Sequence, residues 1–337
     1  WSTDADTRRK SASGGIAAEL YQFALKNGMH AFGVKLDKAH EAHYFEVQNK
    51  KDIDACQNSK YIFSKMGDTY ASIARYLNAG EKVLFIGLPC HVAGVRAYLG
   101  KEYENLLLVD IICHGTCSAR YLKEHIHSIE EKKKEEAETV FFRDPQYGTN
   151  SFIFTLRGGN RVFYSTPVEY LDSYQVGYHK MLTYRENCYH CEYARAERIG
   201  DLTLSDFSGL GRLEPWTEEN RSISCVIPST PKGRFLLDTL QQKEKIELYR
   251  RPAEEAYRFE KQLRGPSAPN VHREAFLKLY SEGNGFDASV RCACKKEMQH
   301  YFVVRTLHIK EIRLACRKLV PAKLKKMIKK RAKRFFA

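Results

Sequence analysis

The chain has 337 residues, 43% hydrophobic and 28% charged, which fits one large globular domain or two moderate ones. No apolar run reaches the roughly eighteen residues that a membrane-spanning helix needs, so the sequence excludes such a helix. The net charge is +14, but residues 305–337 hold thirteen Lys or Arg and one acid, a net of +12 that leaves +2 for residues 1–304. The basicity therefore belongs to a tail, and without a groove-reading motif we expect no nucleic-acid partner.

The first part of the sequence alternates between helix-like and strand-like segments. Helical spacing of apolar residues predicts helices at 14–27, 69–79, 91–99 and about 118–136. Short apolar or alternating runs predict strands at 30–36, 41–47, 82–87 and 105–112. This order is typical of an α/β core with parallel strand pairing.

The middle of the sequence has a different pattern. Three strand-like runs at 138–143, 151–157 and 160–165, with a turn at Gly158-Gly159, predict an antiparallel insert at about 138–166. A helix at 169–180, strands at 201–206 and 222–228 and a helix from 232 complete the core. We therefore expect an α/β fold with α+β elements: a mixed sheet core with flanking helices, an antiparallel insert and a helical C-terminal tail. The expected parts are a core at 1–250, a helical part at 251–304 and a basic amphipathic tail at 305–337.

Ten cysteines are many for a chain that has neither the size nor the signal of a small secreted disulfide-rich domain. Cys90 and Cys113 each follow a predicted buried strand, and the carboxyl ends of such strands line ligand crevices in open α/β sheets. Cys188 and Cys191 form a C-x-x-C pair in a polar loop. These four thiols match the number that a 4Fe-4S cluster requires.

Other interpretations of these cysteines stay open. Four thiolates also suit structural zinc, and a C-x-x-C pair also forms redox disulfides. Cys117 is either a reserve ligand or a buried thiol at a helix start. Three further cysteines are expected to pack in the fold: Cys56, Cys225 and Cys316. The spacing of Cys292 and Cys294 is too tight for a usual metal clamp.

A serine- and glycine-rich segment directly precedes the first predicted helix. Backbone N–H groups at a helix N-terminus attract phosphate, Gly14 and Gly15 let a ligand approach, and the hydroxyls of Ser11 and Ser13 add donors. The same serines also serve simple helix capping.

Three further segments carry candidate flavin-binding residues. Lys60 can supply positive charge and Tyr61 can stack on a ring, although such a pair is also common on an ordinary loop. Gly87 and Pro89 shape the turn before Cys90. Asp206 ends a predicted strand, where a carboxylate either accepts hydrogen bonds from a ribityl chain or caps the next helix.

Six motifs in order resemble the coenzyme F420 hydrogenase/dehydrogenase beta subunit family over roughly the first 230 residues. They are SASGG (11–15), SKYIFS (59–64), GLPC (87–90), VDIICHG (109–115), RENCYHCEYA (185–194) and DLTLSDFSG (201–209). The resemblance implies FAD, one 4Fe-4S cluster and electron transfer between coenzyme F420, or a similar two-electron carrier, and iron–sulfur partners. It implies cluster ligands at Cys90, Cys113, Cys188 and Cys191.

The resemblance also implies a border for the flavin and a partner. The flavin would be bordered by the serine–glycine loop, by Ser59, Lys60, Tyr61 and Ser64, and by the Gly87–Cys90 turn. Many relatives carry a ferredoxin-like domain with C-x-x-C-x-x-C repeats that this sequence lacks, so we expect such a domain or a redox partner protein to interact with it. We expect a cytoplasmic location.

Two histidines and the tail complete the candidates. His91 and His114 flank two proposed ligands, where they can hydrogen-bond sulfur, relay a proton to the flavin or act as ordinary turn residues. In the tail, apolar residues share one helical face and lysines the others, which predicts either contact with the inner face of the membrane or a solvated docking helix. The rival to an oxidoreductase is a non-catalytic, zinc-stabilised binding module that docks through this tail.

Overall fold

The computed structural model describes residues 1–167, 171–218 and 222–306. Within these residues, seven strands form the main sheet, in an order that differs from their order in the sequence. From edge to edge they are β10 (Ser224–Pro228), β9 (Leu202–Asp206), β5 (Leu106–Ile111), β4 (Val83–Gly87), β1 (His30–Leu36), β2 (Ala42–Val47) and β3 (Ser64–Lys65). Strands β9, β5, β4 and β1 are parallel neighbours, whereas β10 and β2 pair antiparallel to β9 and β1. The expected mixed sheet is confirmed.

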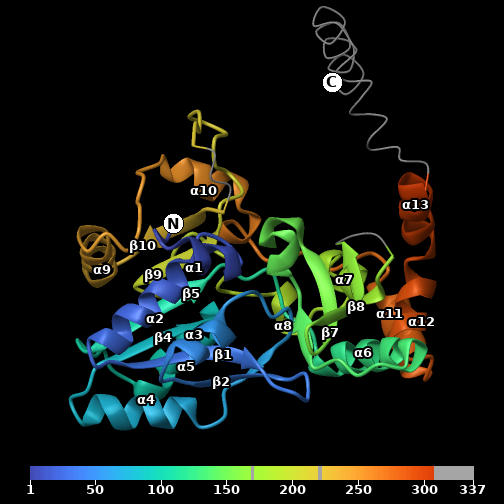
Figure 1. Ribbon diagram of the computed structural model, residues 1–337, viewed down its shortest axis with the longest axis horizontal. Helices are drawn as coiled ribbons and strands as arrows, with labels where there is room; N and C mark the ends of the chain where they lie inside the picture. Colours follow the sequence, from blue (N-terminus) through green and yellow to red (C-terminus); the bar gives the residue numbers. More distant parts are fainter. Residues whose placement is uncertain (168–170, 219–221, 307–337) are drawn as a thin grey trace, which may run out of the picture.

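Helices cover both faces of this sheet (Figure 1). Successive side chains of a strand point to opposite faces of the sheet, so the sheet separates two apolar clusters. Leu84 and Ile86 belong to the cluster on one face, and Phe85 belongs to the cluster on the other. The first cluster includes residues of α2 (Ile16–Lys26), α3 (Lys50–Cys56) and α9 (Pro231–Gln242). The second includes residues of α4 (Thr69–Asn78) and α5 (Pro89–Leu99). We call the sheet and these helices the sheet lobe.

The expected antiparallel insert is a separate three-stranded sheet beside the sheet lobe (Figure 1). Its strands are β6 (Thr139–Phe141), β7 (Ile153–Gly158) and β8 (Arg161–Pro167). Gly158 pairs with Arg161, so the hairpin turn consists of Gly159 and Asn160. The expected Gly158-Gly159 turn is therefore wrong by one residue, because Gly158 is still paired as the last residue of β7. Gly159, with φ of 57°, supplies the left-handed backbone of the turn.

Helices pack against this insert and share an aromatic core with it. They are α6 (Ala119–Lys133), α7 (Ser173–His179), α11 (Arg273–Ser281) and α12 (Phe286–Ala293), followed by α13 (Lys295–Thr306). Phe154, Tyr174, Phe276 and Phe286 are all less than 2% exposed and form the centre of this core. We call the insert and these helices the insert lobe. Short helices join the two lobes or flank the sheet: α1 (Ala5–Lys10), α8 (Glu186–Tyr189) and α10 (Ala253–Phe259).

A buried histidine holds two carboxylates together inside the insert lobe. The two ring nitrogens of His125 lie 2.9 Å from Asp172 Oδ2 and 2.7 Å from Asp287 Oδ1. The Tyr164 hydroxyl donates to the same Asp172 oxygen at 2.6 Å. Burial alone would lower the pKa of His125, but the two carboxylates outweigh it and raise that pKa to about 9. The protonated imidazole therefore bridges α6, the start of α7 and α12.

The basic tail at 307–337 lies outside the described residues, so its expected membrane contact stays a prediction. Among the helices that are described, none combines the length and the hydropathy that crossing a membrane requires. The helical part expected at 251–304 is present as α10 to α13, with a short 3-10 turn at Lys261–Leu263. The expected fold class is confirmed.

Candidate active site

Four cysteines from three separate segments line one cavity of about 500 Å³. Cys90 lies in the first turn of α5, and Cys113 follows the end of β5. Cys188 lies in the four-residue helix α8, and Cys191 follows that helix, so placing both in a loop is wrong for Cys188. The cavity thus brings together the four cysteines that the sequence singles out.

Strand pairing places the first two cysteines at the same edge of the sheet. Strands β4 and β5 are parallel neighbours, with Gly87 opposite Asp110. Chain segments that leave parallel strands at their carboxyl ends emerge side by side. Cys90 and Cys113, which follow these strands by a few residues, therefore meet in one crevice.

Main-chain contacts attach the C-x-x-C segment to the loop after β5. The Arg185 N–H donates to the Thr116 carbonyl at 2.8 Å, and Tyr184 forms an antiparallel bridge with Cys117. The Thr116 N–H donates to Cys188 Sγ at 3.4 Å, and such bonds stabilise a thiolate at a metal site. The second pair of cysteines is thus fixed against the loop that carries Cys113.

Gly115 is required for this close approach. It has φ of 140°, and a Cβ at this position would overlap the ring of Tyr184. Replacement by alanine is expected to destabilise the fold by about 2–5 kcal/mol, because backbone strain and overlap with the ring act together. Denaturant unfolding would measure the loss.

Gly80 provides the control for this change, since it has φ of 80° but no atom near its Cβ position. Gly80→Ala should cost only about 1–2 kcal/mol, from backbone strain alone. Equal losses for the two variants would contradict a specific contact between Gly115 and Tyr184.

Burial favours the protonated form of two of the site thiols, Cys90 and Cys113. Burial raises the pKa of Cys90 to about 11 and that of Cys113 to about 12, and the neighbouring site thiols raise both further. A metal would have to displace these protons to bind sulfur. Among the described residues, no group of three or more His, Cys, Asp or Glu side chains is arranged so that it could hold a metal ion. Ligation by these cysteines therefore stays a prediction.

His91 lines the cavity beside Cys90 and is held from behind by Tyr44. The Tyr44 hydroxyl lies 2.9 Å from His91 Nδ1 and accepts the Leu88 N–H at 3.3 Å. Gly87 makes room for it, because a Cβ there would overlap the Tyr44 hydroxyl. His91 Nε2 is buried without a hydrogen-bond partner among the described residues. Burial, with a smaller effect of Arg185, lowers the pKa of His91 to about 4.

Tyr44→Phe is expected to lower the free energy of unfolding by about 1–3 kcal/mol, since it leaves the Leu88 N–H and His91 Nδ1 unpaired in a buried place. Thermal or denaturant unfolding would measure the change. Tyr98, an exposed tyrosine on the same helix as His91, supplies the control, because Tyr98→Phe removes a hydroxyl that water already hydrates. Equal effects of the two changes would contradict the buried bond.

His114 also lines the cavity, but it is an exposed side chain. Its Nε2 lies 3.9 Å from Glu260 Oε1, and its carbonyl accepts the Ser267 hydroxyl at 2.6 Å. The structure therefore brings both predicted histidines to the cysteine cavity, with His91 fixed and His114 at the exposed rim. Their expected roles as sulfur hydrogen-bond donors or proton relays stay predictions.

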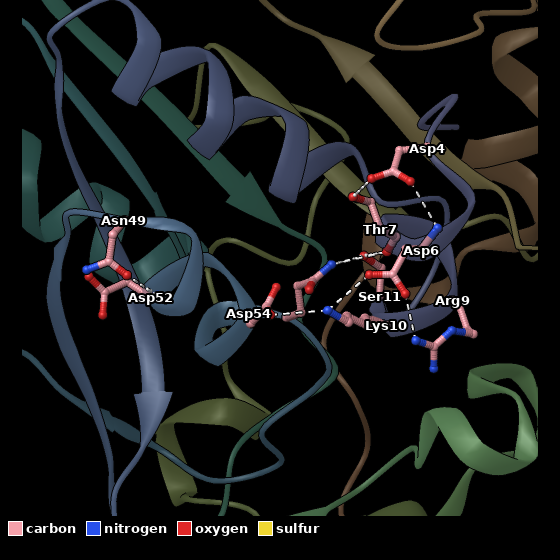
Figure 2. A network of polar contacts seen from close by, with 10 residues as sticks. Asp4, Asp6, Thr7, Arg9, Lys10, Ser11, Asn49, Asp52 and Asp54 are labelled. Carbon is pink, nitrogen blue, oxygen red and sulfur yellow. Dashed lines mark hydrogen bonds and ion pairs between the residues drawn. The ribbon is translucent and has the colours of Figure 1, made fainter.

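The serine–glycine loop joins α1 to α2, a helix that packs on the opposite face of the main sheet from α5. Figure 2 shows Ser11 next to Thr7 and Lys10. The Ser11 hydroxyl donates to the Thr7 carbonyl at 2.7 Å, and Lys10 forms ion pairs with Asp6 and Asp54. Gln57 Nε2 donates to Ser11 Oγ at 3.0 Å, which links this loop to the segment that carries Lys60.

The rest of this loop forms hydrogen bonds with residues at the start of β10. The Ser13 hydroxyl donates to the Ile223 carbonyl at 2.7 Å, and the Gly14 N–H donates to Ser224 Oγ at 2.9 Å. A Cβ at Gly14 would lie 2.8 Å from Ser224 N, and Gly15 precedes α2 with φ of 85°. These contacts give both glycines and both serines structural roles. Phosphate binding at this helix N-terminus stays a prediction.

Lys60 and Tyr61 are held by their own surroundings. Lys60 Nζ donates to the carbonyls of Ala55, Cys56 and Gln57 at 2.8–3.0 Å and so caps the C-terminus of α3. Burial lowers its pKa to about 8. The Tyr61 ring stacks on Tyr178 at 4.4 Å between centroids. Both side chains therefore make specific contacts within the fold, unlike the side chains of an ordinary exposed loop.

The other predicted flavin residues lie in four different places. Pro89 lines the cysteine cavity as the first residue of α5, and Ser64 is buried at the start of β3. The Ser59 N–H donates to the side chain of Asn58 at 2.8 Å. Asp206, at the end of β9, accepts a hydrogen bond from Arg143 Nη1 at 2.8 Å.

Arg143 is the main residue of this region that sequence reasoning missed. It is buried in the insert lobe, its carbonyl accepts the Asn58 side chain, and its guanidinium lies 4.0 Å from the Phe152 ring centroid. It thereby connects the Lys60 segment with Asp206. An isolated Arg after a strand-like run carries no signal of such a role, because its partners are 85 and 63 residues away.

The other cysteines that the structure describes do not line the cavity. Cys117 is fully buried, with its sulfur 3.0 Å from the Tyr174 hydroxyl and 3.1 Å from the Tyr61 carbonyl, which fits the buried-thiol interpretation. Cys225 and Cys294 are buried, Cys56 is partly buried and Cys292 is exposed. Cys316 lies outside the described residues. Each of the nine described cysteines is free, so within this part of the chain no disulfide is present.

Comparisons with known proteins agree with the motif pattern. The family described as coenzyme F420 hydrogenase/dehydrogenase, beta subunit, matches with its N-terminal part at residues 1–69 and its C-terminal part at residues 80–254. No curated protein matches the chain. A similar solved structure, titled as a xenon derivative of the F420-reducing [NiFe] hydrogenase complex from Methanosarcina barkeri, has 16% identity and a TM-score of 0.49 over 90% of this chain and 88% of that one. Because the two family matches span most of the sequence, the chain belongs to the coenzyme F420 hydrogenase/dehydrogenase beta subunit family of electron-transfer oxidoreductases.

Proposed function

We propose that this protein binds FAD and one 4Fe-4S cluster and passes electrons between a two-electron carrier, coenzyme F420 or a similar molecule, and iron–sulfur partners. Family membership supports an oxidoreductase role in general. The observation that carries the finer proposal is the convergence of Cys90, Cys113, Cys188 and Cys191 on one cavity.

The chemistry of this donor set fits an iron–sulfur cluster. A single ion needs all its sulfur ligands at about 2.3 Å from one point. A 4Fe-4S cluster instead takes one cysteine on each of four irons, so its ligands are spread around a larger body. The cavity of about 500 Å³ offers space for such a body, and the Thr116 N–H already points at Cys188 Sγ. Cys90, Cys113, Cys188 and Cys191 would hold the cluster.

A chain of contacts runs from the proposed flavin residues to the cysteines, which supports one coupled site. Tyr61 stacks on Tyr178, and the Tyr178 hydroxyl donates to the Gly115 carbonyl at 3.1 Å, within the loop that carries Cys113. When bound, FAD would supply hydride acceptance and one-electron release, and the cluster would supply a one-electron acceptor. The protein orients both: Tyr44 fixes His91 beside Cys90, while Lys60 holds the Tyr61 segment against α3.

An anaerobic reconstitution of the full chain with iron, sulfide and FAD tests this proposal. We expect flavin absorbance bands over a broad iron–sulfur shoulder, about four irons per chain, and bleaching of the flavin by reduced coenzyme F420 or another two-electron donor. NADH and reduced ferredoxin would be mixed in parallel to identify the donor class.

The outcomes separate the alternatives. A colourless protein that carries zinc would overturn the proposal in favour of a zinc-stabilised binding module. A reconstituted protein with cluster and flavin that no donor reduces would contradict the electron-transfer role while keeping the cofactors. Flavin without iron would remove the cluster from the proposal.

A further inference from the structure

A fully buried carboxylate lies three residues before Cys113. Asp110 is on β5 and is 0% exposed. Its Oδ1 accepts a hydrogen bond from Arg198 Nη2 at 3.1 Å, and its Oδ2 accepts the Gly200 N–H at 3.1 Å. Both carboxylate oxygens therefore bind the segment that follows the C-x-x-C pair.

Arg198 is equally enclosed and uses its other donors on the same segment. Its side chain is 2% exposed. Nη1 donates to the carbonyls of Tyr193 at 2.9 Å and Arg195 at 3.1 Å, and Nε donates to Thr203 Oγ1 at 3.3 Å. Tyr193 lines the cysteine cavity, two residues after Cys191. The guanidinium thus closes the turn that leaves the C-x-x-C pair.

This segment lacks regular secondary structure. Residues 192–201 form no helix or strand. Arg96 of α5, the helix that begins with Cys90, adds one bond from its Nε to the Ile199 carbonyl at 3.1 Å. Residues 193–200 therefore contact α5, the helix of Cys90, and β5, the strand that precedes Cys113, and Asp110 and Arg198 make most of these polar bonds.

A gain in folding stability alone does not explain why the Asp110–Arg198 ion pair is buried. Removing two charges from water offsets most of the attraction between them, so apolar replacements of buried ion pairs are often neutral or stabilising. A buried pair does favour one arrangement of the groups that it bonds, because any other arrangement leaves a charge unpaired.

We propose that Asp110 and Arg198 are positioning residues for the cysteine cavity: they fix the loop of Cys113 and the turn after Cys191 relative to each other. The role of the pair in cluster binding rests on the proposed function. Its role in fixing the two segments of the chain without bound metal does not rest on that function. Loss of the pair loosens residues 188–200 first and lowers the iron retained by the loaded protein.

Hydrogen–deuterium exchange of the iron-free full chain, read by mass spectrometry, provides the test. Asp110→Asn keeps the size of the side chain but removes its charge, and Arg198→Lys keeps the charge but removes the bonds to Tyr193 and Arg195. We expect exchange at residues 188–200 to rise about tenfold or more in each variant. In reconstituted protein, we expect lower iron content and a shifted reduction potential.

Asp144→Asn is the matched control, because Asp144 is just as buried and pairs with Arg157 at 2.6 Å within the insert lobe. It should leave exchange at 188–200 and iron content unchanged. Unaltered exchange at 188–200 in Asp110→Asn or Arg198→Lys, or an equal rise in the control, would overturn the inference. Should Asp110→Asn not fold, Arg198→Lys carries the test. A wild-type chain that takes up no iron would count against the proposed function alone, since the exchange experiment needs none.

Discussion

Cys188→Ala is expected to leave the reconstituted protein with little iron, against about four irons per chain in the wild type. The sulfur of Cys188 already accepts a hydrogen bond from the Thr116 N–H, and its loss removes one of the four proposed ligands. Cys113→Ala should have the same effect from a different segment of the chain. Iron and sulfide analysis with the visible spectrum under anaerobic conditions would measure both.

Cys292 offers the control, because it is an exposed cysteine that does not line the cavity. Cys292→Ala should keep the full iron content and spectrum. Comparable losses in Cys292→Ala and Cys188→Ala would mean that iron binds unspecifically. An intact cluster in Cys188→Ala would remove this residue from the ligand set, and Cys117, the next cysteine along the Cys113 loop, would then have to be tested.

His125→Leu is expected to lower the free energy of unfolding by about 3–5 kcal/mol, because it leaves the buried Asp172 and the partly buried Asp287 without their shared cation. Asp172 is 2% exposed, and no cation other than His125 has an ion pair with it among the described contacts. His127, two residues along α6 and exposed, is the control, and His127→Leu should change stability by about 0.5 kcal/mol or less. Similar losses for both histidines would contradict the buried pair.

The same pair predicts a pH dependence of stability. The pKa of His125 is raised to about 9 in the folded chain, against about 6.5 when unfolded, so its contribution is complete below pH 6.5 and is lost as pH rises through 9. Burial alone would raise the pKa of Asp172, but His125 outweighs it and lowers that pKa, so the contribution of Asp172 is lost as the solution becomes strongly acidic. Denaturant unfolding of wild type and His125→Leu between pH 6 and 9.5 would measure the difference. A difference that stays constant over this range would contradict a charged His125.

Sequence reasoning located the elements and the cysteine site because both depend on local patterns. Buried strands such as 83–87 show as apolar runs, and thiols after two parallel strands must emerge at the same edge of the sheet. Boundaries were less exact: α5 begins at Pro89, so Cys90 is helical, and Cys188 belongs to a single helical turn. Such one-turn differences depend on tertiary contacts that a periodicity does not contain.

Partners at long range could not be read from the sequence. Lys60 caps α3, because three carbonyls without helical partners lie within its reach, and the sequence gives no sign of these bonds. His125 was not singled out, since its carboxylates are 47 and 162 residues away. Asp110 and Arg198 were missed for the same reason, with 88 residues between them. Tertiary packing determines which polar groups become hydrogen-bond or ion-pair partners.

The separation of the site cysteines along the chain also bears on the order of assembly. Cys90 and Cys191 are about a hundred residues apart, and the whole three-stranded insert lies between Cys113 and Cys188. Of the four cysteines proposed to hold the cluster, only Cys188 and Cys191 lie close together before the lobes meet, because closing so long a segment is entropically unfavourable. Complete metallation would then follow folding, and cofactor loading in cells would act as a checkpoint that only fully folded chains pass.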